Sequence, residues 1–166
     1  MWTRMFLKAC STGLLAAVLL TAVGCTSEEK PAGMPELQPV TLTIQQDGAP
    51  LPAASVQLIG TGSEASQWVS GGSTDDNGQV VVMTHGRYKG APVGTYKVTV
   101  SKTLVEGSTM PSDDPGASSS AKSYHVVQAQ YRDASSTPIE IEITSGGNTN
   151  EVIDVGAAVK DPVPML

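Results

Sequence analysis

The chain has few cysteines, few aromatic side chains and a deficit of positive charge. Its only cysteines are Cys10 and Cys25, so neither a disulfide-built scaffold nor a zinc site of several thiolates fits. Aromatic residues make up 4% of the sequence, so an apolar core must consist mainly of Val, Ile and Leu. Ten basic against sixteen acidic side chains give a net charge of −6. No basic cluster is present, so binding to nucleic acid or to an anionic lipid surface is not expected.

An apolar segment without charge, residues 13–23, lies close to the N-terminus and is preceded by Arg4 and Lys8. A run of about 11 such residues matches the hydrophobic region of a secretory signal peptide. It is well short of the roughly 20 residues that a membrane-spanning helix requires. We therefore expect residues 1–24 to be a signal peptide. Its removal takes two of the basic side chains with it and leaves a more acidic chain.

The residues around Cys25 indicate what kind of signal peptide this is. The segment Thr21-Ala22-Val23-Gly24-Cys25 resembles the lipobox of bacterial lipoproteins, with Gly directly before the cysteine and Ala22 where Leu is usual. The resemblance implies diacylglyceryl transfer to Cys25, cleavage before it and acylation, typically by palmitate, of the new amino group. Each buried methylene contributes about 0.8 kcal/mol, so two or three acyl chains anchor a protein firmly. We favour this lipid anchor over plain secretion.

The anchor implies a location in the cell envelope. Thr26 follows the cysteine, where some lipoproteins of the inner membrane carry Asp, so we expect the outer membrane. Residues 25–38 are charged and contain proline without apolar periodicity, which predicts a tether. A single domain is expected over residues 39–156, followed by a flexible tail over residues 157–166.

Alternation of apolar and polar residues dominates that domain, and the pattern predicts strands rather than amphipathic helices. Turns rich in Gly, Asn and Asp separate the strands. Seven strands are expected: 40–45, 55–59, 67–70, 79–83, 95–100, 139–143 and 152–155. Regular spacing of this kind is typical of an all-β fold, and we predict a seven-stranded Greek-key β-sandwich, transthyretin-like or Ig-like.

Four local features refine this prediction. Asp76-Asn77-Gly78 predicts a type I′ hairpin turn, which requires positive φ at both central positions. The continuous Val80-Val81-Val82 predicts a strand that is covered on both faces or central in its sheet, and Trp68 is expected to plug one end of the core. Residues 103–123 are rich in Ser, Pro, Gly and Asp and predict a long loop, of a kind that is usually mobile or functional.

Several motifs together resemble the carboxypeptidase regulatory-like domain, a transthyretin-like sandwich. They are the turn Asp47-Gly48, the small-residue step Pro52-Ala53-Ala54, the hairpin Thr74-Asp75-Asp76-Asn77-Gly78 and the strand Val93-Gly94-Thr95-Tyr96-Lys97-Val98. The similarity covers about residues 38–156. The chain departs from the family pattern at Val93, where Pro is common, and at Val81, where Phe or Tyr is frequent. The resemblance implies a module without peptidase chemistry of its own, and fold alone does not identify an activity.

No set of residues predicts catalysis or a cofactor. The only histidines, His85 and His125, have no local spacing that supplies two metal ligands, so no metal site is expected. Residues 73–78 begin like an EF-hand loop, but Thr84 stands where the bidentate acid is required. No Gly-x-Ser-x-Gly motif is present. We therefore expect a protein that is not an enzyme.

One segment combines cationic and aromatic side chains in an otherwise acidic chain: His85, Arg87, Tyr88 and Lys89. An exposed loop of this composition can stack on a sugar or pair with an anionic partner, although a solvated connection between strands is the plainer interpretation. The function expected is that of a structural or protein-interaction module in the envelope. The alternative is a glycan- or peptide-binding accessory protein that supports an envelope enzyme or transporter.

Overall fold

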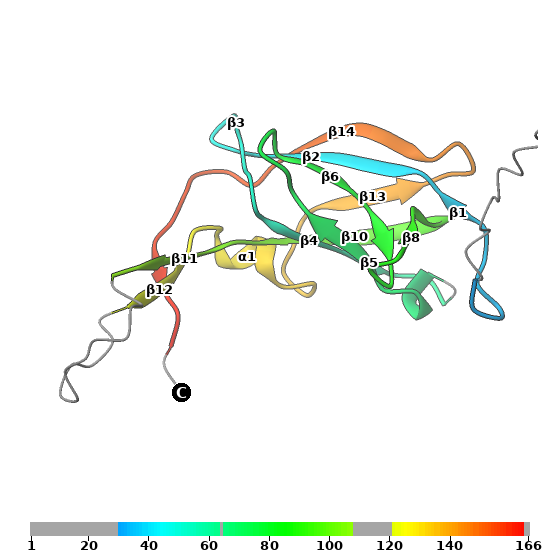
Figure 1. The fold of residues 1–166 in the computed structure, drawn as a ribbon, viewed down its shortest axis with the longest axis horizontal. Helices are drawn as coiled ribbons and strands as arrows, with labels where there is room; N and C mark the ends of the chain where they lie inside the picture. Colours follow the sequence, from blue (N-terminus) through cyan, green and yellow to red (C-terminus); the bar gives the residue numbers. More distant parts are fainter. Residues whose placement is uncertain (1–29, 64, 108–120, 165–166) are drawn as a thin grey trace, which may run out of the picture.

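A computed structural model describes residues 30–63, 65–107 and 121–164 (Figure 1). The predicted signal peptide, Cys25 and the middle of the predicted loop lie outside these residues. The strands are β1 Leu37–Gln38, β2 Val40–Gln46, β3 Ala49–Pro50, β4 Ser55–Gly60, β5 Ser70–Ser73, β6 Gln79–Val81, β7 Met83–Thr84, β8 Tyr88–Lys89, β9 Ala91–Pro92, β10 Gly94–Ser101, β11 Thr103–Glu106, β12 Lys122–His125, β13 Glu140–Ile143, β14 Asn148–Asp154 and β15 Asp161–Pro162. Helical structure within the described residues is confined to the 3-10 turn η1 (Ala65–Gln67) and the one-turn α1 (Ala129–Arg132).

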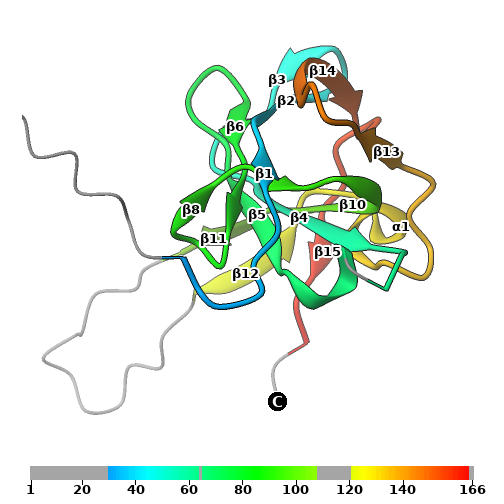
Figure 2. The ribbon, with the colours of Figure 1, turned by 90° about the vertical axis from the view of Figure 1, so that its right-hand side faces the viewer.

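The chain is all-β, as predicted, and its strands build two main sheets around one core. The larger sheet has the order β13-β10-β4-β5-β7-β8, and the smaller has β14-β2-β3 with β6 also paired to β2. Figures 1 and 2 show β2 and β14 lying over β4 and β10. This arrangement is consistent with the predicted sandwich. The described residues form fifteen strands, many very short, so the predicted count of seven and the Greek-key order are not confirmed.

The predicted alternation is confirmed in the strands that supply the core. Val40, Leu42 and Ile44 of β2 are buried, as are Val56 and Leu58 of β4. Apolar residues from both sheets join them in a single cluster, which includes Tyr96, Val98, Val100, Ile141, Ile143 and Ile153. Because the side-chain period of a strand is two, each of these strands buries one face and leaves the other to solvent or to a covering segment.

The last long strand closes the smaller sheet in parallel with the first. β14 pairs with β2 from Asn148↔Val40 to Asp154↔Gln45, with a bulge between Thr149 and Glu151. The other strand pairs described here are antiparallel. β2 is therefore held on both edges, by β14 on one side and by β3 and β6 on the other.

The prediction of one strand over 79–83, covered on both faces or central in its sheet, was wrong. The segment divides at Val82: β6 pairs with β2 in the smaller sheet, and β7 pairs with β5 in the larger. Val80 and Val82 are buried in the core, whereas Val81 is 54% exposed. The chain thus crosses from one sheet to the other here. Only one face of the three-valine segment is buried in the core, and the other face is exposed.

The turn before β6 also differs from the prediction. Gly78 has positive φ (73°), but Asn77 does not, so the turn is not type I′. The Gly78 amide donates to the Asp75 carbonyl (3.0 Å), and the Asp75 carboxylate accepts from the amides of Asn77 and Gln79. A type I turn followed by a left-handed glycine has this pattern. Because β5 and β6 lie in different sheets, the turn joins the sheets instead of making a hairpin.

Two smaller boundaries also needed correction. The predicted strand 67–70 starts only at Ser70, because residues 65–67 form η1. The predicted tether ends earlier than residue 38, because β1 pairs with β9 and half-buries Leu37 and Gln38 against the domain.

Part of the predicted loop 103–123 and part of the predicted flexible tail are ordered strands. β11 pairs with β12, and β12 pairs with β15, so the three form a small antiparallel sheet that we call the arm. Figure 1 shows the arm extending away from the two main sheets, as a continuation of β10. Hydrogen bonds from the amides of Val159 and Val163 to the carbonyls of Val126 and Ser123 fasten the C-terminal segment to it.

Candidate functional site

The segment singled out from the sequence forms the hairpin between β7 and β8. His85 and Gly86 have φ values of 53° and 67°, and they are the two left-handed central residues of the β-turn from Thr84 to Arg87. The Arg87 amide donates to the Thr84 carbonyl (3.2 Å), and the His85 amide donates to the Val69 carbonyl (2.8 Å). His85, Arg87 and Lys89 are exposed at this hairpin. The turn is therefore fixed on the adjoining segment and presents cationic side chains.

Tyr88, however, is buried, with 7% of its surface exposed. The guanidinium carbon of Arg87 lies 5.5 Å from the centre of its ring. Tyr88 therefore cannot serve as the exposed stacking surface that the sequence suggested. Strand alternation explains why Tyr88 is buried. Tyr88 lies opposite Thr84, and both side chains face inward, whereas the pair Met83 and Lys89 faces outward.

The aromatic ring that does accompany this hairpin is Trp68, which sequence analysis assigned to the core. Trp68 is only half-buried and is not a member of the core cluster. Its ring centre lies 5.3 Å from that of His85, at an interplanar angle of 36°. The β7–β8 turn and the η1–β5 connection thus bring together two residues that the sequence gives no reason to associate.

A shallow groove of about 390 Å³ runs beside His85 across the outer face of β4, β5 and β7. We call it the sheet groove. Ser55 and Gln57 of β4, Ser73 of β5 and Met83 of β7 line it, together with Val69, His85 and the glycines of β5. A methyl group at Gly71 would collide with the Val56 carbonyl oxygen, so this position requires glycine and the floor here is bare backbone. The groove is therefore uncharged and mostly apolar, with a few polar side chains among its lining residues.

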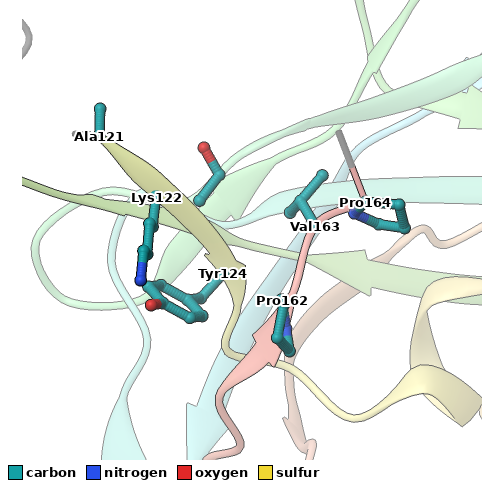
Figure 3. Close-up of a pocket in the computed structure, with 7 residues that line it drawn as sticks. Ala121, Lys122, Tyr124, Pro162, Val163 and Pro164 are labelled. Atoms are coloured by element: carbon teal, nitrogen blue, oxygen red, sulfur yellow. The ribbon is translucent and has the colours of Figure 1, made fainter. Parts of the chain in front are cut away.

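The second concavity lies on the arm (Figure 3). This arm pocket, of about 370 Å³, lies between β12 and the C-terminal segment and is lined by Lys122, Tyr124, Pro162, Val163 and Pro164 with Ala121 and Ser123. Figure 3 shows Lys122 and Tyr124 projecting to the same side of β12. No sequence signal marked this site, because most of its lining residues lie in the predicted loop 103–123 or in the predicted tail 157–166.

Two ion pairs fasten the C-terminal segment to β11 and to α1. Lys160 donates to both carboxylate oxygens of Glu106 (2.8 and 2.7 Å), and its ammonium lies 4.5 Å from the centre of the Tyr124 ring. The Glu106 carboxylate raises the pKa of Lys160. Arg132 donates to Asp161 (3.1 Å) at the base of the segment. Lys122 lies opposite Glu106 in the strand register, but the Glu106 carboxylate is paired with Lys160. Lys122 therefore makes no ion pair within the described residues.

Beside the pocket, the edge strand β11 exposes large apolar side chains. Leu104 is 45% exposed and Val105 is 56% exposed, although they point to opposite faces of the arm. β11 has a partner on only one side within the described residues. An exposed strand edge with apolar side chains is a template for another strand.

The described residues contain no group of three or more His, Cys, Asp or Glu side chains placed to hold a metal ion. His85 and His125 lie in different parts of the fold, the first at the β7–β8 turn and the second in β12, where its Nδ1 is 3.4 Å from the Thr103 hydroxyl. Across the same described ranges, no helix has the length and apolar character needed to cross a membrane.

Comparison of the chain with protein-family models, with curated proteins and with solved structures gives no match in any of the three.

Proposed function

We propose that the chain is a lipid-anchored module of the cell envelope, most consistent with the outer membrane, that binds another protein and has no catalytic activity. The lipobox-like residues before Cys25 support the anchor. We further propose that the sandwich is a seven-stranded Greek-key domain of the carboxypeptidase regulatory-like kind. The motifs around Asp47-Gly48, residues 74–78 and residues 93–98 support that relationship, and the all-β architecture is compatible with it.

The single observation that carries the binding function is the arm. The arm exposes Leu104 on one face and Val105 on the other, and neither side chain belongs to the hydrophobic core cluster. Small exposed sheets are marginal in water, and an exposed strand edge that carries apolar side chains is a template for another strand. The arm therefore has the properties of a binding element rather than of scaffold.

The features of the arm define the partner by its chemistry. The free edge of β11 offers backbone hydrogen bonds to an extended segment, and Leu104 and Tyr124, which are opposite in register, offer it an apolar surface. Lys122, on the same face and without an ion pair among the described residues, offers a positive charge to a carboxylate. We propose an extended segment of another envelope protein that carries an apolar side chain and an acidic one.

This proposal is tested by site-specific photo-crosslinking in cells. A crosslinking side chain at Val105 is expected to form adducts with one partner at a yield about tenfold above the same side chain at Val152. Val152 is a matched control because it is 57% exposed on β14, away from the arm. Lys122→Glu is expected to lower the adduct yield at Val105 about tenfold, since it replaces attraction with repulsion of the carboxylate.

Two further results decide the crosslinking experiment. Lys97→Glu, which reverses a charge on β10 outside the arm, is expected to leave the yield unchanged. The crosslinked peptide of the partner is expected to be extended and acidic. Equal adduct yields at positions 105 and 152, or no effect of Lys122→Glu, contradict the arm as the binding surface.

The anchor has a separate test in Cys25→Ser. Without the thiol no diacylglyceryl group can be attached, so the chain is expected to leave the membrane fraction or to remain uncleaved. Fractionation and mass spectrometry of the N-terminus measure both outcomes, and Cys10→Ser is the matched control because Cys10 lies inside the predicted signal peptide. A membrane fraction unchanged by Cys25→Ser contradicts the anchor.

A further inference from the structure

The sheet groove differs from the rest of the surface in its charge. The chain as a whole carries −6, yet the groove is lined by no Asp, Glu, Lys or Arg, and His85 is its one titratable side chain. A ligand that enters it therefore meets neither a charge to pair with nor a charge to avoid. This composition favours a neutral, hydroxyl-rich ligand over a phosphate or carboxylate compound.

Three polar side chains that line the groove are not used by the fold, whereas the hydroxyl of a fourth, Ser70, is hydrogen-bonded to Thr84. The Gln57 amide and the hydroxyls of Ser55 and Ser73 make no hydrogen bond to any other side chain or backbone group in the described part of the chain. Ser55 and Ser73 lie directly opposite each other in the β4–β5 register, and Gln57 lies opposite Gly71. The paired strands hold the backbone of these residues at fixed spacing, so only the side-chain rotamers have to be ordered on binding.

One edge of the groove is apolar and rigid. Met83, Val69 and the imidazole of His85 form it, and Val69 is 69% exposed. The hydrogen bond from the His85 amide to Val69 and the contact of the His85 ring with Trp68 hold this edge in place. At Gly71 the missing side chain lets a ligand approach the sheet backbone.

We propose that the sheet groove binds a neutral oligosaccharide. A pyranose ring has an apolar C–H face and a rim of hydroxyl groups, which matches an apolar edge beside unpaired amide and hydroxyl groups. The volume of about 390 Å³ lies within the size range of small-molecule sites and accommodates one or two sugar rings. In this arrangement Gln57, Ser55 and Ser73 bind the hydroxyls, and His85 and Met83 contact the C–H face.

The chain contains its own probe for this binding. Outside the predicted signal peptide, Trp68 is the one tryptophan, and it contacts His85. Its fluorescence is to be followed in residues 25–166 as neutral hexasaccharides of glucose (α1–4 and β1–4), N-acetylglucosamine, xylose and mannose are added. An open groove predicts a Kd of about 0.1–1 mM for at least one of these sugars. Isothermal titration calorimetry measures the same affinity independently of the fluorophore.

Two substitutions with matched controls assign the binding to the groove. Gln57→Ala and His85→Ala are each expected to weaken the Kd about tenfold or more, measured by calorimetry. Gln79→Ala, on β6 of the other sheet, and His125→Ala, on the arm, are expected to change it less than twofold. Circular dichroism checks that each variant retains its fold.

Three outcomes overturn the proposal. The first is that no neutral sugar gives a response up to about 10 mM. The second is that Gln57→Ala and His85→Ala leave the affinity unchanged, and the third is that a hexagalacturonate binds more tightly than every neutral sugar. Because none of the groove residues belongs to the arm, the failure of this proposal leaves the peptide-binding proposal intact, and the reverse also holds.

Discussion

Tyr96→Ala is expected to lower the free energy of unfolding by about 4 kcal/mol, the typical cost of removing a large buried aromatic side chain. Tyr96 has no exposed surface and is the largest fully buried side chain described. It lies on β10 between β4 and β13, opposite Gly60 and Ile141. Its loss leaves a cavity where three strands meet. Urea unfolding of residues 25–166 measures the change, and a loss below about 1 kcal/mol contradicts it.

Tyr96→Phe separates the hydroxyl group from the ring. The hydroxyl donates to the Pro92 carbonyl (2.8 Å), so its removal is expected to cost about 1–2 kcal/mol at neutral pH. Burial raises the pKa of Tyr96 from its usual value of about 10 to about 12. Between about pH 10 and pH 12 the unfolded chain ionises and the folded chain does not, so stability falls by about 1.4 kcal/mol per pH unit. Below that window the group has no effect on the pH dependence. The Phe variant is expected to lose this part of the alkaline decline; an identical decline in both proteins contradicts the assignment.

Thr74→Val is expected to destabilise the domain by about 3 kcal/mol even though it preserves the shape of the side chain. Thr74 is 6% exposed, and its hydroxyl donates to the Leu51 carbonyl (2.6 Å) and accepts from the Ala54 amide (2.8 Å). Valine leaves both backbone groups buried without these partners. The hydroxyl thus connects the turn between the two sheets to the start of β4, and chemical denaturation measures its contribution.

Two other threonine variants make the Thr74 prediction specific. Thr74→Ser keeps the hydroxyl and is expected to cost only about 1 kcal/mol, through the lost methyl group. Thr43→Val, on the half-buried face of β2, removes a hydroxyl that makes no side-chain hydrogen bond with the described residues, and a change within about 0.5 kcal/mol is expected. Similar losses for Thr74→Val and Thr43→Val show that the hydrogen bonds of Thr74 are unimportant.

Both proposed binding surfaces lie outside the core of the sandwich. The sandwich buries one face of each strand, and its outer face at β4, β5 and β7 carries the sheet groove. The arm is an extension of β10 and the C-terminal segment, held by Lys160 and Glu106. A rigid core therefore presents two separate surfaces, and a lipid at Cys25 is proposed to keep both close to a membrane.

The sequence by itself determined the fold class and the strands with strict alternation. In β2, β4, β10 and β13 the apolar residues alternate with polar ones, and a strand of period two has one way to bury them. The anchor, the tether and the family resemblance likewise come from local residues alone, and they stay predictions. Local patterns suffice wherever one strand's own side chains decide which face is buried.

Only the tertiary structure decided what depends on partners distant in the chain. Val81 is exposed because β6 and β7 join different sheets, and Tyr88 is buried because β8 follows the alternation of β7. The arm exists because residues 103–106, 122–125 and 161–162 pair with one another, although two of these segments lie in stretches that resemble loop and tail. Trp68 meets His85 for the same reason. The sequence of one segment does not indicate which distant segment it will pair with or contact. No local pattern could therefore have predicted these pairings and contacts.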